Sequence, residues 1–318
     1  MLIAVRLPNW LGDIVMALDF LRDLRESYPK CRFIFIIKPL YKAVLEVLEY
    51  DYAVEEFDKK TFPGLSGVRS FSKKFVSKYG KASIYYCMPP SFSSALMGKF
   101  IAKEVVGYQG NWRGMLLDKP IAPPGKIHRS EEYRGLLGVG DHQKPIKKQI
   151  IGKTSKKILI NINSEASSRR VSIENWKQLI ENLGEQDFFL IGAPSDSERV
   201  SSLTRILSEN VRVTNLAGKT SIPELIRLFK DSKLLISNDS GPAHLAAGFG
   251  LDVAVFFGAG DPDNTAPIPR EGIVHVLSRK LSCSPCLKNT CPLGTIECLD
   301  FDMTSVGKEI RSKFNLET

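Results

Sequence analysis

The feature that constrains the fold most is a regular alternation of short apolar segments with amphipathic ones. The apolar segments of the first half include Leu2 to Leu7, Arg32 to Ile37 and Ser83 to Cys87. Helical patterns lie between and after them, around Tyr41 to Leu48 and Ser93 to Ala102. Because a helix that links two strands returns the chain in the same direction, this alternation predicts a parallel sheet covered by helices.

A second series of the same kind follows a segment rich in Pro and Gly, Pro120 to Lys157, where we place the connection between two domains. The apolar segments of this series are Lys157 to Ile162, Phe188 to Ile191, Val211 to Leu216, Leu234 to Ser237 and Val253 to Phe257. The sequence therefore predicts an α/β protein of two Rossmann-like, doubly wound parallel-sheet domains, residues 1–150 and 151–318.

The end of the chain carries one more helical pattern. Val306, Ile310 and Phe314 recur every four residues, so they share one face of a helix. We expect this face to pack back onto the first domain.

The charge balance favours anionic partners. The chain has 44 Lys and Arg against 35 Asp and Glu, a net charge of +9. Much of the excess lies in the first half, at Lys42, Lys59, Lys60, Lys73, Lys74, Lys78, Lys81, Lys99 and Lys103. The first domain is therefore the better candidate for an acidic acceptor or a membrane surface, although a solvated basic face without a specific partner stays open.

No apolar run approaches the roughly 18 residues that a membrane-spanning helix needs. The opening run, Met1 to Arg6, is too short for the core of a signal peptide. We expect a cytoplasmic protein.

The most informative motif follows the apolar segment Leu234 to Ser237 and reads Asn-Asp-Ser-Gly-Pro-Ala-His. Ser240 suits the N-cap of a helix, Gly241 allows a close approach of the backbone to a ligand, and Pro242 suits the first turn. The free N–H groups of such a turn bind phosphate, so we expect a pyrophosphate here.

Asp239 and His244 flank this turn at the carboxyl end of a strand, where open parallel sheets bind their ligands. A capped helix with a core histidine is the alternative. The density of these residues in one turn favours a binding site.

A second loop of this kind runs from Asn161 to Arg170. Its adjacent Arg169 and Arg170 suit a leaving diphosphate, because each guanidinium makes charge-assisted hydrogen bonds. After the next strand, Asp196 in Gly192-Ala193-Pro194-Ser195-Asp196 suits either a ribose hydroxyl or a helix cap. The full dinucleotide fingerprint and a phosphate loop are both missing, which disfavours NAD and P-loop chemistry.

In the first domain, Asn9-Trp10-Leu11-Gly12-Asp13 places a carboxylate in the first turn of a helix, at the expected cleft between the domains. Asp13 is therefore a candidate general base for an acceptor hydroxyl, and Trp10 and Gly12 are candidate acceptor contacts. Stabilisation of the helix dipole alone would also explain Asp13.

These motifs resemble one family, the ADP-heptose lipopolysaccharide heptosyltransferases of glycosyltransferase family 9. The resemblance covers nearly the whole chain in order. It is carried by Gly12-Asp13, Arg169-Arg170, Gly192-Ala193-Pro194, Asp239-Ser240-Gly241-Pro242-Ala243-His244, and by Cys283-Ser284-Pro285-Cys286 with Cys291-Pro292-Leu293-Gly294, which look like the second heptosyltransferase subtype.

The resemblance implies a GT-B fold whose first lobe binds the acceptor and whose second binds ADP-heptose, with inversion at the anomeric carbon. It implies that Asp13 is the catalytic base. The donor contacts it implies are Arg169, Arg170, Gly192, Asp196, Asp239, Ser240, Gly241 and His244. The chain departs from the family pattern at Arg169, where a Lys is usual, and at Arg170-Val171-Ser172 in place of Arg-Trp-Pro.

The partners implied are ADP-heptose and an acceptor that is either lipid A-Kdo or the lipopolysaccharide inner core, met by peripheral contact with the cytoplasmic face of the inner membrane. Nucleic acid is not an implied partner. Two other classes stay open: another nucleotide-sugar enzyme of the same fold, such as a 2-epimerase, and a non-enzymatic basic anion-binding protein.

Four cysteines, Cys283, Cys286, Cys291 and Cys298, have the spacing C-x2-C-x4-C-x6-C. Reduced thiols at such spacing can bind a structural zinc, or they can simply be buried. The resemblance implies no cofactor for catalysis, and disulfides are disfavoured in the cytoplasm.

Overall fold

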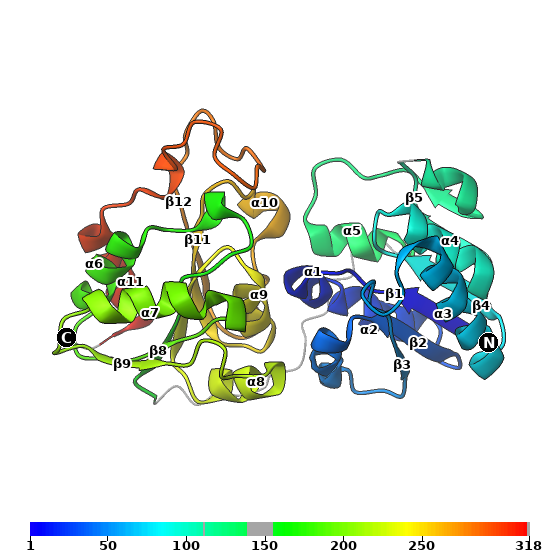
Figure 1. The fold of residues 1–318 in the computed structure, drawn as a ribbon, viewed down its shortest axis with the longest axis horizontal. Coiled ribbons are helices and arrows are strands. Elements are labelled where there is room, and N and C mark those ends of the chain that lie inside the picture. Colours follow the sequence, from blue (N-terminus) through cyan, green and yellow to red (C-terminus); the bar gives the residue numbers. More distant parts are fainter. Residues whose placement is uncertain (111, 139–154, 317–318) are drawn as a thin grey trace. The chain divides into compact units, whose positions relative to one another are not determined.

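The computed structural model describes residues 1–110, 112–138 and 155–316. The chain divides into two compact units, Met1–Gln143 and Lys144–Thr318, and each has its own sheet and its own helices (Figure 1).

The first unit is built on a six-stranded parallel sheet of order β3-β2-β1-β4-β5-β6. Its strands are β1 Leu2–Arg6, β2 Arg32–Ile37, β3 Ala53–Glu56, β4 Ala82–Cys87, β5 Ala102–Tyr108 and β6 Lys119–Ile121. The chain moves outward from β1 to one edge and then from β4 to the other. The direction therefore reverses between β1 and β4, the arrangement of a doubly wound sheet.

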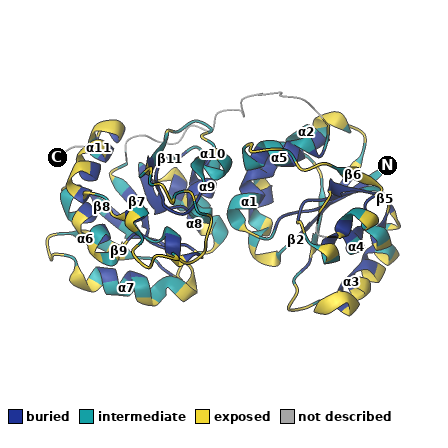
Figure 2. Cartoon of the chain, turned by 90° about the horizontal axis from the view of Figure 1, so that it is seen from above, coloured by how far each residue is buried: buried dark blue, intermediate teal, exposed yellow. Residues whose placement is uncertain are grey.

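Helices cover both faces of this sheet. They are α1 Leu11–Met16, α2 Leu18–Ser27, α3 Gly64–Tyr79, α4 Phe92–Ile101 and α5 Arg129–Gly135, with short 3-10 segments η1 Pro39–Val47 and η2 Arg113–Leu116. The helices α1, α2 and α5 pack together on one side, and α3 packs on α4 on the other (Figure 2). Phe71 and Phe75 of α3 are buried against the sheet in the core of that second side.

The second unit repeats the architecture. Its parallel sheet has the order β12-β11-β10-β7-β8-β9, which is the order of the first sheet when strands are counted from the start of each unit. The strands are β7 Lys157–Asn161, β8 Asp187–Leu190, β9 Arg212–Asn215, β10 Leu234–Asn238, β11 Asp252–Phe257 and β12 Val274–Ser278. Here the direction reverses between β7 and β10.

The helices of the second unit are α6 Ile173–Asn182, α7 Ser197–Ile206, α8 Ile222–Lys230, α9 Gly241–Gly248, α10 Pro262–Thr265 and α11 Met303–Phe314, with 3-10 segments η3 Ser167–Arg169, η4 Pro194–Asp196 and η5 Glu297–Leu299. Trp176 of α6 is fully buried and meets Phe256 of β11 edge to face. Burial of every β10 side chain explains why that strand reads as a continuous apolar run up to its polar end.

The C-terminal helix does not pack as the sequence suggested. Val306, Ile310 and Phe314 of α11 lie in the core of the second unit, and α11 packs on α6. Arg311 adds a hydrogen bond of 2.8 Å to the carbonyl of Asn182 at the end of α6. The apolar face is therefore used within its own unit.

The predicted α/β class of two doubly wound parallel sheets is confirmed. The segment predicted as the connection is partly structured, because β6 and α5 of the first unit lie within it or at its start. Its remaining predicted turn residues, Gly140 and Pro145, lie outside the described residues.

Candidate functional site

The candidate donor residues of the second unit gather at the reversal point of its sheet. The strands β7 and β10 are hydrogen-bonded neighbours, so the loops that follow them start side by side. One loop carries Arg169 and Arg170, and the other carries Asp239 and Ser240. Open parallel sheets leave a crevice at this point, which is where their ligands bind.

Amide and hydroxyl side chains join the two loops. Asn161 at the end of β7 donates through Nδ2 to Ser240 Oγ at 2.7 Å, and Ser164 Oγ donates to the carbonyl of Asp239 at 2.9 Å. From the other side, Asn238 Nδ2 donates to the carbonyl of Ile162 at 2.7 Å. Because these groups are shielded from water, their bonds hold both loops in one arrangement.

The Asp239 side chain belongs to the second of these loops and is only 3% exposed. Arg169 Nη1 lies 3.2 Å from Asp239 Oδ2 and forms an ion pair with it. Burial raises the pKa of Asp239 from its ordinary 3.8 to about 6, and the positive charge of Arg169 offsets only part of that increase. Space around the carboxylate is tight, since a Cβ on Gly260 would lie 2.3 Å from Oδ2.

From the raised pKa of Asp239 we predict how the free energy of unfolding depends on pH. The folded protein holds this proton more tightly than the unfolded chain, so the stabilisation is complete below pH 3.8 and is lost as the pH rises through about 6. We expect Asp239→Asn to be more stable than the parent at pH 7, by about 2–3 kcal/mol, and to lose the slope of stability between pH 4 and 6.

Denaturant unfolding at a series of pH values measures both effects. Asp231→Asn, which alters an exposed carboxyl in the same unit, is the matched control and should keep the parent slope. An Asp239→Asn protein with an unchanged slope would contradict the prediction.

The start of α9 differs in one detail from the sequence prediction. Ser240 occupies the N-cap position, but its hydroxyl makes no capping bond and instead donates to the carbonyl of Asn238 at 3.1 Å. Gly241 and Pro242 open the helix as expected. With no side chain capping it, the positive end of the α9 dipole lies beside the Arg169 loop, which is the condition for anion binding.

The other donor candidates, His244, Gly192 and Asp196, differ in their burial and in their contacts. His244 is 5% exposed on α9. Gly192 approaches the loops closely, because a Cβ there would lie 2.8 Å from Asn163 Nδ2. Asp196 Oδ2 accepts a hydrogen bond of 2.9 Å from the Ala193 N–H, so the capping role is the one its contacts show.

Arg170 also has a local role. Its Nε donates to the carbonyl of Ser164 at 2.6 Å, across its own loop. Of the two adjacent arginines, Arg169 is thus the one paired with the buried carboxylate, and Arg170 closes the loop that presents it.

In the first unit, the loop after β1 is at the reversal point of that sheet. The buried Arg6 holds the loop by donating from Nη2 to Asn9 Oδ1 at 2.8 Å. Asp13 follows in the first turn of α1, after Gly12, and Tyr133 of α5 donates from its hydroxyl to Asp13 Oδ1 at 3.1 Å. Trp10 is 54% exposed, and the Lys38 ammonium lies 5.2 Å from the centre of its ring.

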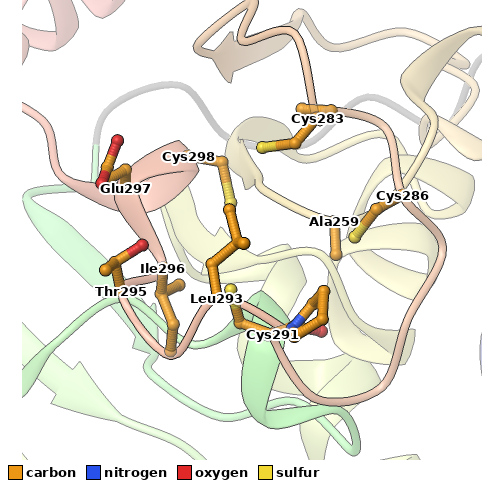
Figure 3. Close-up of a pocket in the computed structure, with 12 residues that line it drawn as sticks. Ala259, Cys283, Cys286, Cys291, Leu293, Thr295, Ile296, Glu297 and Cys298 are labelled. Atoms are coloured by element: carbon orange, nitrogen blue, oxygen red, sulfur yellow. The ribbon is translucent and has the colours of Figure 1, made fainter.

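The four clustered cysteines line one small apolar pocket in the second unit, with Leu293, Ile296 and Ala259 among its other walls (Figure 3). Hydrogen bonds from backbone N–H groups, those of Ile296 and Leu293 foremost, lower the pKa of Cys291. Within the described ranges, no three His, Cys, Asp or Glu side chains are grouped so that they could hold a metal ion. The structure thus brings Cys283, Cys286, Cys291 and Cys298 to one pocket, and the structural zinc stays a prediction.

Sequence reasoning assigned no role to several residues that shape these sites. Asn161, Ser164 and Asn238 join the two donor loops, and Tyr133 contacts the candidate base. The amides could have been noticed as polar residues at the ends of apolar strands. Tyr133 had no such signal, because it lies in the segment interpreted as a connection.

The chain matches the model of glycosyltransferase family 9 (heptosyltransferase) over residues 128–297, more than half of its length. It is 27% identical over 319 residues to lipooligosaccharide heptosyltransferase 2 of Campylobacter jejuni, covering 94% of this chain and 93% of the relative.

Two solved structures show the same fold. The E. coli ADP-heptose lps heptosyltransferase II is 18% identical with a TM-score of 0.81 and 99% of each chain covered. The E. coli heptosyltransferase WaaC with ADP-2-deoxy-2-fluoro heptose is 16% identical with a TM-score of 0.73, covering 98% of this chain and all of the other. These likenesses confirm the GT-B fold class.

Proposed function

We propose, on the premise that this chain belongs to glycosyltransferase family 9, the heptosyltransferases, that it moves heptose from ADP-heptose to the inner core of lipopolysaccharide. Family membership makes the chain a glycosyltransferase. The donor, the acceptor and the residues that carry the reaction belong to the proposal.

The observation that carries the proposal is the joined pair of loops at the β7–β10 reversal point. A cation on one loop, Arg169, and the uncapped start of α9 on the other offer a diphosphate both a guanidinium and backbone N–H donors. The fold match to WaaC with an ADP-heptose analogue supports the same donor class.

In the proposed reaction, an acceptor hydroxyl attacks the anomeric carbon of heptose. A bond forms between that oxygen and the carbon as the bond from the carbon to the diphosphate oxygen breaks, which inverts the configuration. Asp13 takes the proton of the hydroxyl, and ADP leaves with the bonding electrons. Arg169 and the α9 N–H groups stabilise the charge that develops on the leaving diphosphate, so this chemistry requires no metal.

The acceptor is proposed to be anionic and lipid-linked, either lipid A-Kdo or the first heptose of the inner core. Exposed lysines of the first unit, such as Lys59, Lys73 and Lys103, offer positive charge for such a partner and for peripheral contact with anionic lipid at the cytoplasmic face of the inner membrane. In the part of the chain that the structure describes, no helix has the length and apolar character to cross a bilayer.

Release of ADP tests the proposal. We expect the intact protein to release ADP from ADP-heptose only when a heptose-deficient lipopolysaccharide acceptor is present, with Kdo-terminated and heptose-terminated acceptors assayed separately. Release without any acceptor would indicate hydrolysis of the donor instead of transfer. No release with either acceptor would overturn the donor assignment.

A further inference from the structure

Tyr133 meets the candidate base from a helix far along the chain. Its side chain is buried, and its hydroxyl donates to Asp13 Oδ1 at 3.1 Å. The two residues belong to α5 and α1, which pack on each other on one side of the first sheet. A buried hydroxyl placed on a carboxylate at the reversal point of a sheet is more than a packing contact, because it fixes the direction of that carboxylate.

Tyr133 can act only as the donor of this bond. Burial, and secondly the negative charge of Asp13, raise the pKa of Tyr133 well above its ordinary value, so the phenol stays protonated at any working pH. The charged groups that face the phenol are Asp13 of α1 and Arg129 and Glu132 of its own helix. The hydroxyl therefore stabilises the ionised form of Asp13, the form that accepts a proton.

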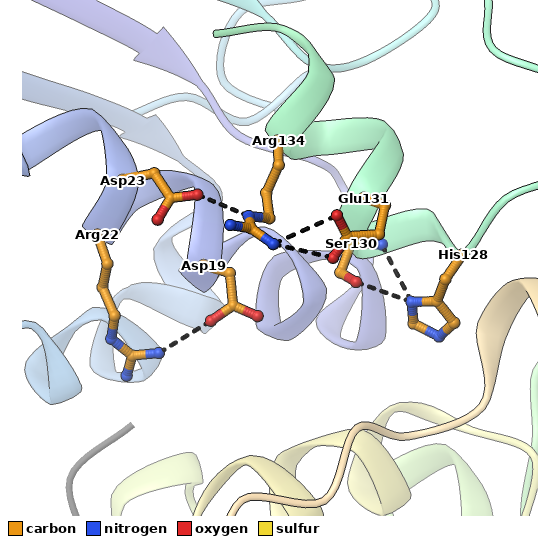
Figure 4. Close-up of polar contacts among 7 residues, drawn as sticks. All are labelled: Asp19, Arg22, Asp23, His128, Ser130, Glu131 and Arg134. Atoms are coloured by element: carbon orange, nitrogen blue, oxygen red, sulfur yellow. Dashed lines mark hydrogen bonds and ion pairs between the residues drawn. The ribbon is translucent and has the colours of Figure 1, made fainter. Parts of the chain in front are cut away.

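The helix that carries Tyr133 is held to α2 by the next residue. Arg134 Nε lies 2.6 Å from Asp23 Oδ2, and Arg134 Nη1 also donates to Glu131 at 3.1 Å (Figure 4). The Arg134 side chain is 8% exposed and that of Asp23 is 22% exposed, so solvent and salt screen this pair less than a fully exposed one. Asp23 lies on α2, which directly follows α1 in the chain. The ion pair therefore joins α5 to the pair of helices that includes Asp13.

We propose that Tyr133 is a positioning residue for Asp13, holding its carboxylate ionised and in one orientation, and that the Arg134–Asp23 pair keeps Tyr133 in place. The inference deepens the proposed function and rests on Asp13 being the base.

Tyr133→Phe removes one hydroxyl and little volume. We expect kcat to fall about tenfold, because the carboxylate loses the contact that fixes its orientation toward the acceptor hydroxyl. The acidic limb of the kcat profile should move to higher pH by about one unit, since the ionised carboxylate loses a donor. The KM for ADP-heptose should stay within about twofold, because Tyr133 belongs to the first unit and the donor loops to the second.

Tyr108→Phe is the matched control. Tyr108 is also buried, and its hydroxyl also contacts α5, by donating to the carbonyl of Glu132 at 2.5 Å. Tyr108→Phe removes a hydroxyl of β5 that contacts α5 and does not alter the bond to Asp13, so the acidic limb of its kcat profile should match that of the parent. Asp23→Asn tests whether the Arg134–Asp23 pair keeps Tyr133 in place. We expect this variant to lower kcat about threefold and to move the acidic limb of the kcat profile to higher pH by less than Tyr133→Phe does.

We would measure kcat, its pH profile and the KM for ADP-heptose from acceptor-dependent ADP release across pH 5 to 9. The proteins compared are the parent, Tyr133→Phe, Tyr108→Phe and Asp23→Asn. In an Asp13→Asn background Tyr133→Phe should have no further effect on kcat, as a residue that acts through Asp13 must. Equal profiles for Tyr133→Phe and Tyr108→Phe, or a full tenfold loss that persists in the Asp13→Asn background, would overturn the inference. An inactive parent, or an Asp13→Asn protein as active as the parent, would instead remove the proposed function itself.

Discussion

Asp13→Asn is expected to lower kcat by about 10²–10⁴-fold, the range that general-base catalysis supplies. The substitution keeps the shape of the side chain and an oxygen for the Tyr133 hydroxyl, which lies 3.1 Å from Asp13 Oδ1. It removes the charge and the basicity of the carboxylate. The donor loops are in the other unit, so the affinity for ADP should be unchanged.

Asp19→Asn is a suitable control for this prediction. Asp19 lies on α2 and pairs with Arg22 of the same helix at 3.3 Å. It therefore has the same charge as Asp13 and lies near it in the chain, but it is not a candidate base. Initial rates of ADP release with acceptor and calorimetric binding of ADP measure the two quantities. A loss below tenfold for Asp13→Asn, in protein with the parent unfolding midpoint, would argue that another group takes the proton.

The sequence predicted most strands that are buried on both faces and missed the edge strands β3, β6 and β12, although the edge strand β9 was predicted from Val211 to Leu216. Apolar runs mark β2 and β10 because helices cover both sides of each. The edge strands β3 and β12 carry partly exposed residues and lack such a run. The strand β5 escaped notice for another reason, since it starts at Ala102 directly after α4 ends at Ile101 and no turn residue separates them.

The candidate donor site could be predicted as a set of loops, but its internal bonding could not. Turn residues after apolar strands identify the loops, because parallel strands end at a common edge. Whether a serine caps a helix or bonds elsewhere depends on a partner from another strand, and Ser240 is bonded to Asn161, 79 residues away. The same holds for Asp13 and Tyr133, which are 120 residues apart.

The cysteine spacing shows the limit of a local pattern. Spacing alone allows a zinc site, yet whether four thiols can share an ion depends on where a loop turns and which apolar side chains enter between them. In this loop Leu293 and Ile296 line the same pocket as the four cysteines. The spacing therefore predicts that the four thiols lie together, while the zinc ion stays a prediction.

Arg169→Ala is expected to lower kcat about 10²–10³-fold, comparable to the removal of one donor that stabilises charge in a transition state. Charge develops on the diphosphate as the bond to the anomeric carbon breaks, and Arg169 is the cation beside the uncapped start of α9. The KM for ADP-heptose should rise less than kcat falls, because the charge is greatest after bond cleavage has begun.

Arg169→Ala also affects the buried Asp239, because Asp239 loses the positive charge that lowers its pKa. Arg169→Ala should therefore raise the pKa of Asp239 further, and the carboxyl will accept a proton near neutral pH rather than remain as a buried charge. The double variant Arg169→Ala with Asp239→Asn separates the two effects. If it regains stability but no activity, the missing guanidinium is what the reaction lacks.

Arg169→Lys supplies the decisive comparison. A lysine keeps the charge and loses the planar fork, so it should recover most of kcat if Arg169 serves the diphosphate by charge, and little if two parallel hydrogen bonds are needed. Arg212→Ala, which removes an exposed ion pair with Asp187 in the same unit, should leave kcat within about twofold of the parent. A kcat of Arg169→Ala equal to that of the parent would show that the α9 N–H groups stabilise the leaving diphosphate without Arg169.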